Sequence, residues 1–293
     1  MKLIKEKVLS VIMSALNEDV GSGDVTTALI FEKDFNAQAE IITKDDTIIA
    51  GTDIVRWIFD AVDERIKVIA LCKDGDRIKK GKKVIHLKGP IRGILSGERT
   101  ALNFLSRLSG VATLTSEFVK RIKGTNVKIL DTRKTMPGLR ILEKYAVAAG
   151  GGYNHRMGLW DEVLIKDNHL EGLKLDVENS RLKAIIDSVT AGKKRGHQNI
   201  EIEVINLKEF KAALEAGADI IMLDNMKIGD IKKAVKLKTA RDKRQAREVL
   251  LEASGGVNLD NVRSIAKTGV DRISIGALTH SAPSIDFSLR VCK

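Results

Sequence analysis

The sequence has little cysteine and no long hydrophobic run. Its two cysteines, Cys72 and Cys292, lie far apart and lack metal-type spacing, which favours a reduced, cytoplasmic setting over a disulfide-stabilised secreted one. Neither a signal-peptide core nor an apolar span of about 18 residues is present. We therefore expect a soluble cytoplasmic protein with no membrane partner.

Several patterns of other functional classes are also missing. The five histidines do not have the i, i+4 spacing of a zinc site, and no nucleophile-bearing triad appears. Residues 232–247 are strongly basic, but no aromatic residues interleave for base stacking, so a solvated helix face explains them better than nucleic-acid binding. Glu18, Asp19 and Asp24 lie in an expected loop at 17–27 without calcium-loop spacing, and we interpret that loop as a capped turn.

The bulk composition is that of a globular protein with an excess of positive charge. The chain has 293 residues, 43% hydrophobic and 30% charged, with a formal net charge of +11. This length allows one large or two ordinary domains with ample core. The charge favours anionic partners such as phosphorylated metabolites and carboxylates.

The hydrophobic patterns indicate two kinds of architecture. An amphipathic helix is expected at 1–16, and short alternating segments at 37–42, 47–50, 66–71 and 83–87 predict a small antiparallel sheet with a helix at 53–59. From residue 127 strand and helix patterns alternate, which predicts parallel strands in a closed or nearly closed barrel. The strands of this second region are expected at 127–130, 163–165, 200–204, 220–223, 249–252 and 272–275.

Charged residues and glycines follow nearly every one of these parallel strands. Because the carboxyl ends of parallel strands meet at one edge, we expect the side chains there to share a ligand. Arginine forks suit carboxylates, lysines offer compact charges, and glycines let backbone N–H groups approach a phosphate. The residues at these ends are Arg133, Lys134, Lys166, Glu203, Asp224, Asn225, Ser254, Gly255, Gly256 and Gly276.

The motifs at these positions resemble one enzyme family along nearly the whole chain. They are DTRKT with Pro-Gly at 131–138, GGG-x-NHR at 150–156 and IKDNH at 165–169, together with segments at 18–27, 97–103, 254–256 and 276–283. The resemblance is to quinolinate phosphoribosyltransferase, also called nicotinate-nucleotide pyrophosphorylase. It implies an α/β fold with an incomplete, open α/β barrel and an N-terminal α+β sandwich domain. The domains would be 1–108, a catalytic barrel at 109–276, and a return of 277–293 to the first domain.

The resemblance also implies a reaction. The phosphoribosyl group of phosphoribosyl pyrophosphate would pass to quinolinate with decarboxylation, giving nicotinate mononucleotide, pyrophosphate and CO₂ for NAD biosynthesis. Mg²⁺ would be held mainly through pyrophosphate and water, near Glu203 and Asp224. The expected assembly is a homodimer, or dimers stacked into a hexamer, in which Arg99 crosses the interface to the neighbouring site.

Matching motifs assign roles to single residues. The residues expected to act in the reaction itself are Lys134, Lys166, Glu203 and Asp224. Those expected to contact quinolinate are Arg99 of the neighbouring subunit, Arg133, His155, Arg156 and Lys166. The phosphoribosyl pyrophosphate side would use Lys134, Glu203, Asp224, Ser254, Gly255, Gly256 and Gly276.

Three alternatives compete with this interpretation. A related molybdenum-transport-associated protein has a similar fold and a different acceptor, but the IKDNH segment favours the quinolinate enzyme. A Schiff-base aldolase would use Lys166 as its nucleophile, which the neighbouring cations disfavour. A nucleic-acid-binding protein would use the basic residues 232–247.

Overall fold

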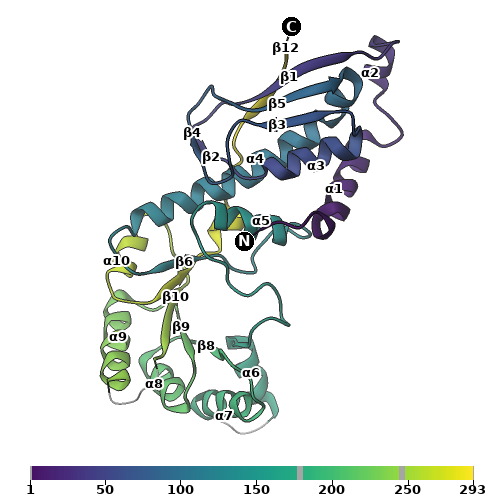
Figure 1. The fold of residues 1–293 in the computed structure, drawn as a ribbon. Coiled ribbons are helices and arrows are strands. Elements are labelled where there is room, and N and C mark those ends of the chain that lie inside the picture. Colours follow the sequence, from purple (N-terminus) through teal and green to yellow (C-terminus); the bar gives the residue numbers. More distant parts are fainter. Residues whose placement is uncertain (1, 177–180, 244–247, 293) are drawn as a thin grey trace. The chain divides into compact units, whose positions relative to one another are not determined.

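The computed structural model describes residues 2–176, 181–243 and 248–292, and the chain forms two compact units (Figure 1). The N-terminal unit comprises Met1–Glu117, Lys134–Gly152 and Ala277–Lys293, and the barrel unit comprises Phe118–Arg133 and Tyr153–Gly276. Within the described residues no helix is long and apolar enough to span a membrane. The fold is of the predicted α/β class.

The N-terminal unit contains an antiparallel sheet with the strand order β12-β1-β5-β3. The alternating burial along β1, with Ala39, Ile41 and Thr43 fully buried, matches one face on a core. The strand β12 pairs with β1 from Gln38–Cys292 to Thr43–Phe287, so the end of the chain returns to this sheet. The strands are β1 (Asn36–Thr43), β3 (Lys67–Ala70), β5 (Lys83–Pro90) and β12 (Phe287–Cys292), and β2 (Thr47–Ile48) pairs with β4 (Arg77–Ile78).

Helices pack with this sheet. They are α1 (Lys5–Val20), α2 (Val25–Ile30), α3 (Thr52–Val62), α4 (Ile91–Arg121, which runs on into the barrel unit), α5 (Arg140–Ala149) and α11 (Ala277–His280). The predicted 17–27 loop is wrong at both ends, because α1 continues to Val20 and α2 begins at Val25. The capped turn lies between them: the Asp24 carboxylate accepts the Thr27 N–H at 2.9 Å.

The helix α5 lies in the N-terminal unit, whereas the sequence-based division placed residues 109–276 together. Two side-chain contacts account for this. The Tyr145 hydroxyl donates to Asp74 at 2.5 Å, and the fully buried Glu143 carboxylate accepts from Nε of Arg107 at 2.9 Å. These partners are 71 and 36 residues away in the sequence, so no local pattern indicates them.

The barrel unit contains six parallel strands in the order β6-β11-β10-β9-β8-β7. All six predicted strands are present. Within the described residues the two end strands of this order, β6 and β7, do not pair with each other, so the barrel is open, as expected. The strands are β6 (Lys128–Leu130), β7 (Leu164–Ile165), β8 (Glu201–Val204), β9 (Ile220–Asp224), β10 (Leu250–Ser254) and β11 (Arg272–Ser274).

Helices alternate with these strands, as the sequence predicts. Their ends follow local signals: the Asn206 side chain accepts the N–H groups of Lys208 and Glu209 at the start of α8, and Gly217 ends that helix at φ 83°. The helices are α6 (Asp167–Asp176), α7 (Arg181–Lys194), α8 (Leu207–Ala216), α9 (Ile228–Asp242) and α10 (Val262–Ala266). The basic 232–247 segment is α9 as far as Asp242; its residues 244–247 lie outside the described part.

Candidate active site

The carboxyl ends of the parallel strands bring the predicted residues of the barrel unit to one edge of the sheet. In the strand register Ile165 pairs with Ile202, Val204 with Leu223, and Ser254 with Asp224. The β11 strand pairs with β6 up to Ser274 and Leu130. The residues at this edge are therefore Arg133, Lys166, Glu203, Asp224, Ser254, Gly255, Gly256 and Gly276, which come from all six strands.

One acid–base pair at this edge joins β7 to β8. Lys166 Nζ lies 3.5 Å from the Glu203 carboxylate, with the lysine side chain 45% exposed and the glutamate 12% exposed. The Asp167 N–H also points at Glu203, at 3.4 Å. His169, the last residue of the IKDNH segment, accepts the Lys166 N–H on Nδ1 at 2.9 Å. The carboxylate is thus held in place, while the ammonium group keeps access to solvent and to an anion.

A second cluster joins the ends of β9 and β10. Asn225 has a left-handed backbone (φ 52°); its side chain donates to Asp224 at 2.8 Å, and its N–H donates to the Ser254 carbonyl at 2.9 Å. Gly255 is required here, because a Cβ on it would lie 2.2 Å from Asn225 Oδ1. A Cβ on Gly256 would meet nothing within 4 Å, so open space for a ligand adjoins that backbone.

Two arginines lie close enough for their charges to interact. Arg156 is buried at 5% exposure, and its guanidinium donates to the Glu162 carbonyl at 2.9 Å. Burial and then the positive charge of Arg133 lower the pKa of Arg156. Two guanidinium groups near the edge of the sheet offer planar donor sets suited to a carboxylate or phosphate.

The segment 153–156, which delivers Arg156, is attached to the edge of the sheet. Tyr153 forms a parallel bridge with Leu130 and donates its N–H to the Ile129 carbonyl at 2.8 Å. The fully buried Asp131 carboxylate accepts the Asn154 side-chain amide at 2.6 Å and the His155 N–H at 2.9 Å. A short loop that would otherwise be free to move is thereby fixed at three consecutive residues.

The next side chain, His155, enters a buried cluster of charged groups. Its Nε2 lies 3.2 Å from Glu201 and 3.5 Å from Glu252. Arg272 neutralises both acids, with Nε 2.7 Å from Glu252 and a terminal nitrogen 3.5 Å from Glu201. Both glutamates are at most 1% exposed, so each depends on these partners for its charge.

The ionisation of this cluster follows from its burial and its charges. Burial alone would lower the pKa of His155. The nearby carboxylates of Glu201 and Glu252 outweigh burial and raise this pKa to about 9. The Arg156 N–H donates to Nδ1 at 2.8 Å, and this contact favours the neutral ring. Burial and repulsion from Glu252 raise the pKa of Glu201. Burial would also raise the pKa of Glu252, but His155 and Arg272 lower it overall. Glu252 is therefore the more acidic partner.

His155, Glu201 and Glu252 could also be considered as metal ligands, because their ligand atoms lie within 4.8 Å of one another. Within the described residues this is the one group of histidine, cysteine and acidic side chains with that spacing. The Arg272 guanidinium lies 2.7 Å from Glu252, and its positive charge would repel a cation placed between the acids. We therefore interpret the group as a buried ion cluster. The acidic residues of the 17–27 segment do not form such a group.

The sequence analysis did not single out Glu201, Glu252 or Arg272. A signal was nevertheless available, since charged or polar residues recur with period two in otherwise apolar strands: Glu at 201 and 203, Glu and Ser at 252 and 254, and Arg and Ser at 272 and 274. In the register Glu203, Met222, Glu252 and Arg272 are successive partners, so they share one face of the sheet. That face is polar, which is unusual for the interior of a small barrel.

Two of the predicted site residues belong to the N-terminal unit. Arg99 is an exposed residue of α4. Lys134, also exposed, begins the 134–152 segment of this unit, and its carbonyl accepts the Thr279 hydroxyl at 2.6 Å. The contact fixes the backbone of Lys134 within the unit and leaves its side chain at the surface.

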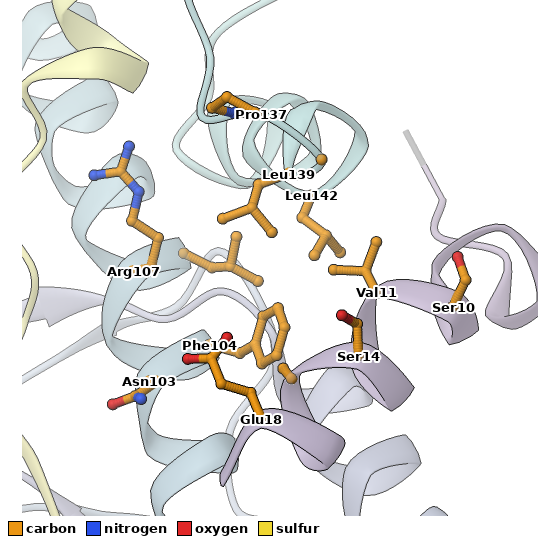
Figure 2. Close-up of a pocket in the computed structure, with 13 residues that line it drawn as sticks. Ser10, Val11, Ser14, Glu18, Asn103, Phe104, Arg107, Pro137, Leu139 and Leu142 are labelled. Atoms are coloured by element: carbon orange, nitrogen blue, oxygen red, sulfur yellow. The ribbon is translucent and has the colours of Figure 1, made fainter.

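The N-terminal unit also contains a pocket of about 530 Å³ between α1, α4 and the start of α5. Figure 2 shows Val11, Phe104, Leu139 and Leu142 directed toward one another there. Arg107, one of its charged residues, is already held by Glu143 at 2.6 Å. The pocket is mainly apolar, so its chemistry differs from that of the cationic edge of the barrel unit.

Comparison with known proteins agrees with this arrangement. A sequence model of the quinolinate phosphoribosyl transferase N-terminal domain matches residues 24–109, and one of the C-terminal domain matches residues 111–290. A Bacillus subtilis protein named probable nicotinate-nucleotide pyrophosphorylase [carboxylating] is 43% identical over 94% of this chain and 90% of its own length. Nicotiana glauca quinolinate phosphoribosyltransferase [decarboxylating] 2, mitochondrial, is 39% identical over 96% of this chain and 81% of its own length.

A solved structure gives the same result for the fold. The nicotinate-nucleotide pyrophosphorylase from Francisella tularensis superimposes with a TM-score of 0.89 at 39% identity, covering 99% of this chain and 98% of that one. The sequence models, the relatives and the structure all extend over both units. The chain belongs to the quinolinate phosphoribosyl transferase family.

Proposed function

We propose that the protein transfers the phosphoribosyl group of phosphoribosyl pyrophosphate to quinolinate and releases nicotinate mononucleotide, pyrophosphate and CO₂, as a step of NAD biosynthesis in the cytoplasm. The observation that carries this proposal is the gathering of Lys166, Glu203 and Asp224 at the carboxyl ends of the parallel strands, with the guanidinium groups of Arg133 and Arg156 near the same edge. A dicarboxylate beside a sugar phosphate accounts for both groups of residues.

The cationic and the acidic residues have separate roles in the proposed reaction. Arg133, Arg156 and Lys166 hold the carboxylates of the pyridine ring, so that the ring nitrogen faces the anomeric carbon of ribose. As the bond to pyrophosphate breaks, positive charge develops on the ribose, and the Glu203 and Asp224 carboxylates stabilise it. Most of the rate enhancement then comes from positioning and preorganised charge.

Decarboxylation follows from the same bond formation. When the pyridine nitrogen has bonded to ribose, its positive charge stabilises the electron pair that departing CO₂ leaves on the adjacent ring carbon. A proton then takes the place of CO₂ on the ring carbon. The quaternised ring supplies the electron sink, so the reaction requires no organic cofactor.

We include Mg²⁺ in the proposal. The carboxylates of Glu203 and Asp224 are hard oxygen donors of the kind this ion accepts, and a site built on substrate phosphates and water fits its preference. When bound, the ion neutralises charge on pyrophosphate as a Lewis acid. The backbone at Gly255 and Gly256, with positive φ of 90° and 58°, adjoins this position and suits close approach of a phosphate.

We also propose a homodimer in which Arg99 serves the site of the partner subunit. Arg99 is exposed on α4, so its guanidinium is available to another chain. A cation from the partner subunit would add to Arg133, Arg156 and Lys166 around a ligand that carries two carboxylates. Stacking of dimers into a hexamer would leave this arrangement unchanged.

The test is an assay of purified protein with quinolinate, phosphoribosyl pyrophosphate and Mg²⁺, in which nicotinate mononucleotide and CO₂ should form in equal amounts. A panel of other heterocyclic acceptors tests the molybdenum-associated alternative, which the names of the curated relatives do not favour. Product from another acceptor and none from quinolinate would reverse that assignment.

A further inference from the structure

We propose that Thr279 and Glu143 are positioning residues, which hold the backbone of the loop that carries Lys134. This role rests on the proposed function for the identity of the ligand, because the motif of Lys134 implies contact with phosphoribosyl pyrophosphate. Thr279 lies in the 276–283 segment, whose residues beyond Gly276 have no part in the reaction described above. Glu143 lies outside every motif, within α5.

The Thr279 hydroxyl is a fixed donor in the interior of the N-terminal unit. Thr279 is fully buried, and its hydroxyl donates to the Lys134 carbonyl at 2.6 Å. Its own carbonyl accepts an N–H of the Arg107 guanidinium, whose other terminal nitrogen donates to the Ala282 carbonyl at 3.0 Å. Arg107 belongs to α4, so the short helix α11 that contains Thr279 is attached to the long helix, and the hydroxyl keeps its place.

Glu143 holds the same loop two residues further along the chain. Its carboxylate is fully buried, and Oε2 accepts the Met136 N–H at 3.1 Å. The other oxygen, Oε1, accepts from Arg107 at 2.9 Å and 2.6 Å. Because the Arg107 side chain is only 16% exposed, this ion pair is largely shielded from water. One guanidinium therefore fixes both Thr279 and Glu143.

The remaining residues of the loop have partners of their own. The Thr135 hydroxyl accepts the Nε–H of Arg140 at 3.0 Å. Residues 136–139 form a turn, closed by a 3.1 Å hydrogen bond from the last N–H to the first carbonyl, in which Gly138 has a φ of 79°. The backbone is thus fixed from Lys134 to the start of α5.

The position of this backbone determines where the Lys134 ammonium group can bind. Lysine has a flexible four-carbon stem, so its side chain supplies reach but little direction. An anchored backbone restricts the region that the ammonium group can occupy and reduces the entropy lost when the group contacts a phosphate. Thr279 and Glu143 therefore act on the substrate through Lys134.

Replacing Thr279 with valine removes the hydroxyl and keeps a branched side chain of similar size. In Thr279→Val the KM for phosphoribosyl pyrophosphate should rise about fivefold or more, as expected for loss of one hydrogen bond that positions a binding group. The KM for quinolinate should stay within about twofold of the wild type. Thr279→Ser retains the hydroxyl and should restore the first KM. An unchanged KM for phosphoribosyl pyrophosphate in Thr279→Val, or an equal rise in Thr279→Ser, would overturn the proposal.

Thr115→Val is the matched control. Thr115 is also a fully buried threonine of the N-terminal unit, and its hydroxyl donates to the Val111 carbonyl within α4 at 2.7 Å. Its replacement should lower Tm about as much as Thr279→Val does and leave both KM values unchanged. A rise in the KM for phosphoribosyl pyrophosphate in this control as well would attribute the effect to lost stability and overturn the proposal.

A second variant applies if Thr279→Val does not fold. In Glu143→Gln the amide nitrogen cannot accept a hydrogen bond, so the side chain loses either the Arg107 or the Met136 contact. The same rise in the KM for phosphoribosyl pyrophosphate, with the KM for quinolinate unchanged, is expected. Wild-type values of both constants would contradict the role of Glu143.

A measurement without ligand separates this role from the proposed function. Amide hydrogen exchange in the peptide containing residues 134–138 should be about tenfold faster or more in Thr279→Val and Glu143→Gln than in the wild type and Thr115→Val. Unchanged exchange would refute the positioning role even in an active enzyme. Faster exchange in a protein that forms no nicotinate mononucleotide would refute the proposed function and leave the positioning of the loop intact.

Discussion

Replacing Glu252 with Gln should destabilise the protein much more than replacing Glu201 with Gln. Glu252 is fully buried and lies 2.7 Å from Arg272 Nε; its pKa is lowered by His155 and Arg272 against the effect of burial, so it is the charged partner. After this substitution the Arg272 guanidinium, which is 16% exposed, would keep Glu201, at 3.5 Å, as the remaining acid of this pair of glutamates. Breaking a buried ion pair costs roughly 3–5 kcal/mol. Because Glu201 would still partly neutralise Arg272, we expect the free energy of unfolding to fall by about 3 kcal/mol.

Glu201 provides the matched control for this substitution. It is equally buried, but burial and then the charge of Glu252 raise its pKa, so a neutral amide resembles its preferred form. Its replacement by Gln should cost under about 1.5 kcal/mol, in the range of one net hydrogen bond.

Thermal unfolding followed by circular dichroism distinguishes the two variants. Because about 1 kcal/mol corresponds to roughly 2–4 °C for a unit of 150–250 residues, Glu252→Gln should lower Tm by about 6–12 °C. Glu201→Gln should lower it by a few degrees. Equal losses, or a larger loss for Glu201→Gln, would refute the assignment of charge within the cluster.

Three other predictions concern the site. Arg133→Ala should weaken quinolinate binding by roughly 2–5 kcal/mol; near-normal affinity in a titration would remove Arg133 from the site. Gly255→Ala should cost about 1–3 kcal/mol from its positive φ alone and raise KM for phosphoribosyl pyrophosphate, and an unchanged KM would contradict the role of this backbone. Mixing subunits that carry Arg99→Ala with subunits that carry Lys166→Ala should restore part of the activity in heterodimers, and no restoration would argue that each chain completes its own site.

Local signals accounted for most of the secondary structure. The amphipathic pattern of residues 1–16 predicted α1, whose buried residues are Val8, Ile12 and Leu16, and α8 begins and ends at the local signals Asn206 and Gly217. The alternation of strand and helix predicted the parallel sheet, and with it the edge at which the charged residues meet. These features are readable because each depends on residues within a few positions of one another.

Features that depend on distant partners were not predicted. The position of α5 in the N-terminal unit depends on Tyr145 with Asp74 and Glu143 with Arg107. Likewise, Glu201, Glu252 and Arg272 become a cluster only when β8, β10 and β11 lie in one sheet. Their sequence signal, a charged or polar residue at every second strand position, is equally typical of a solvent-exposed face. The pattern alone cannot distinguish these two environments.

A crystal structure with quinolinate bound tests the central claim most directly. The ring should lie at the carboxyl ends of the parallel strands with a carboxylate between Arg133 and Arg156. Quinolinate bound elsewhere, or Arg133 and Arg156 facing separate regions of solvent in that complex, would contradict the account.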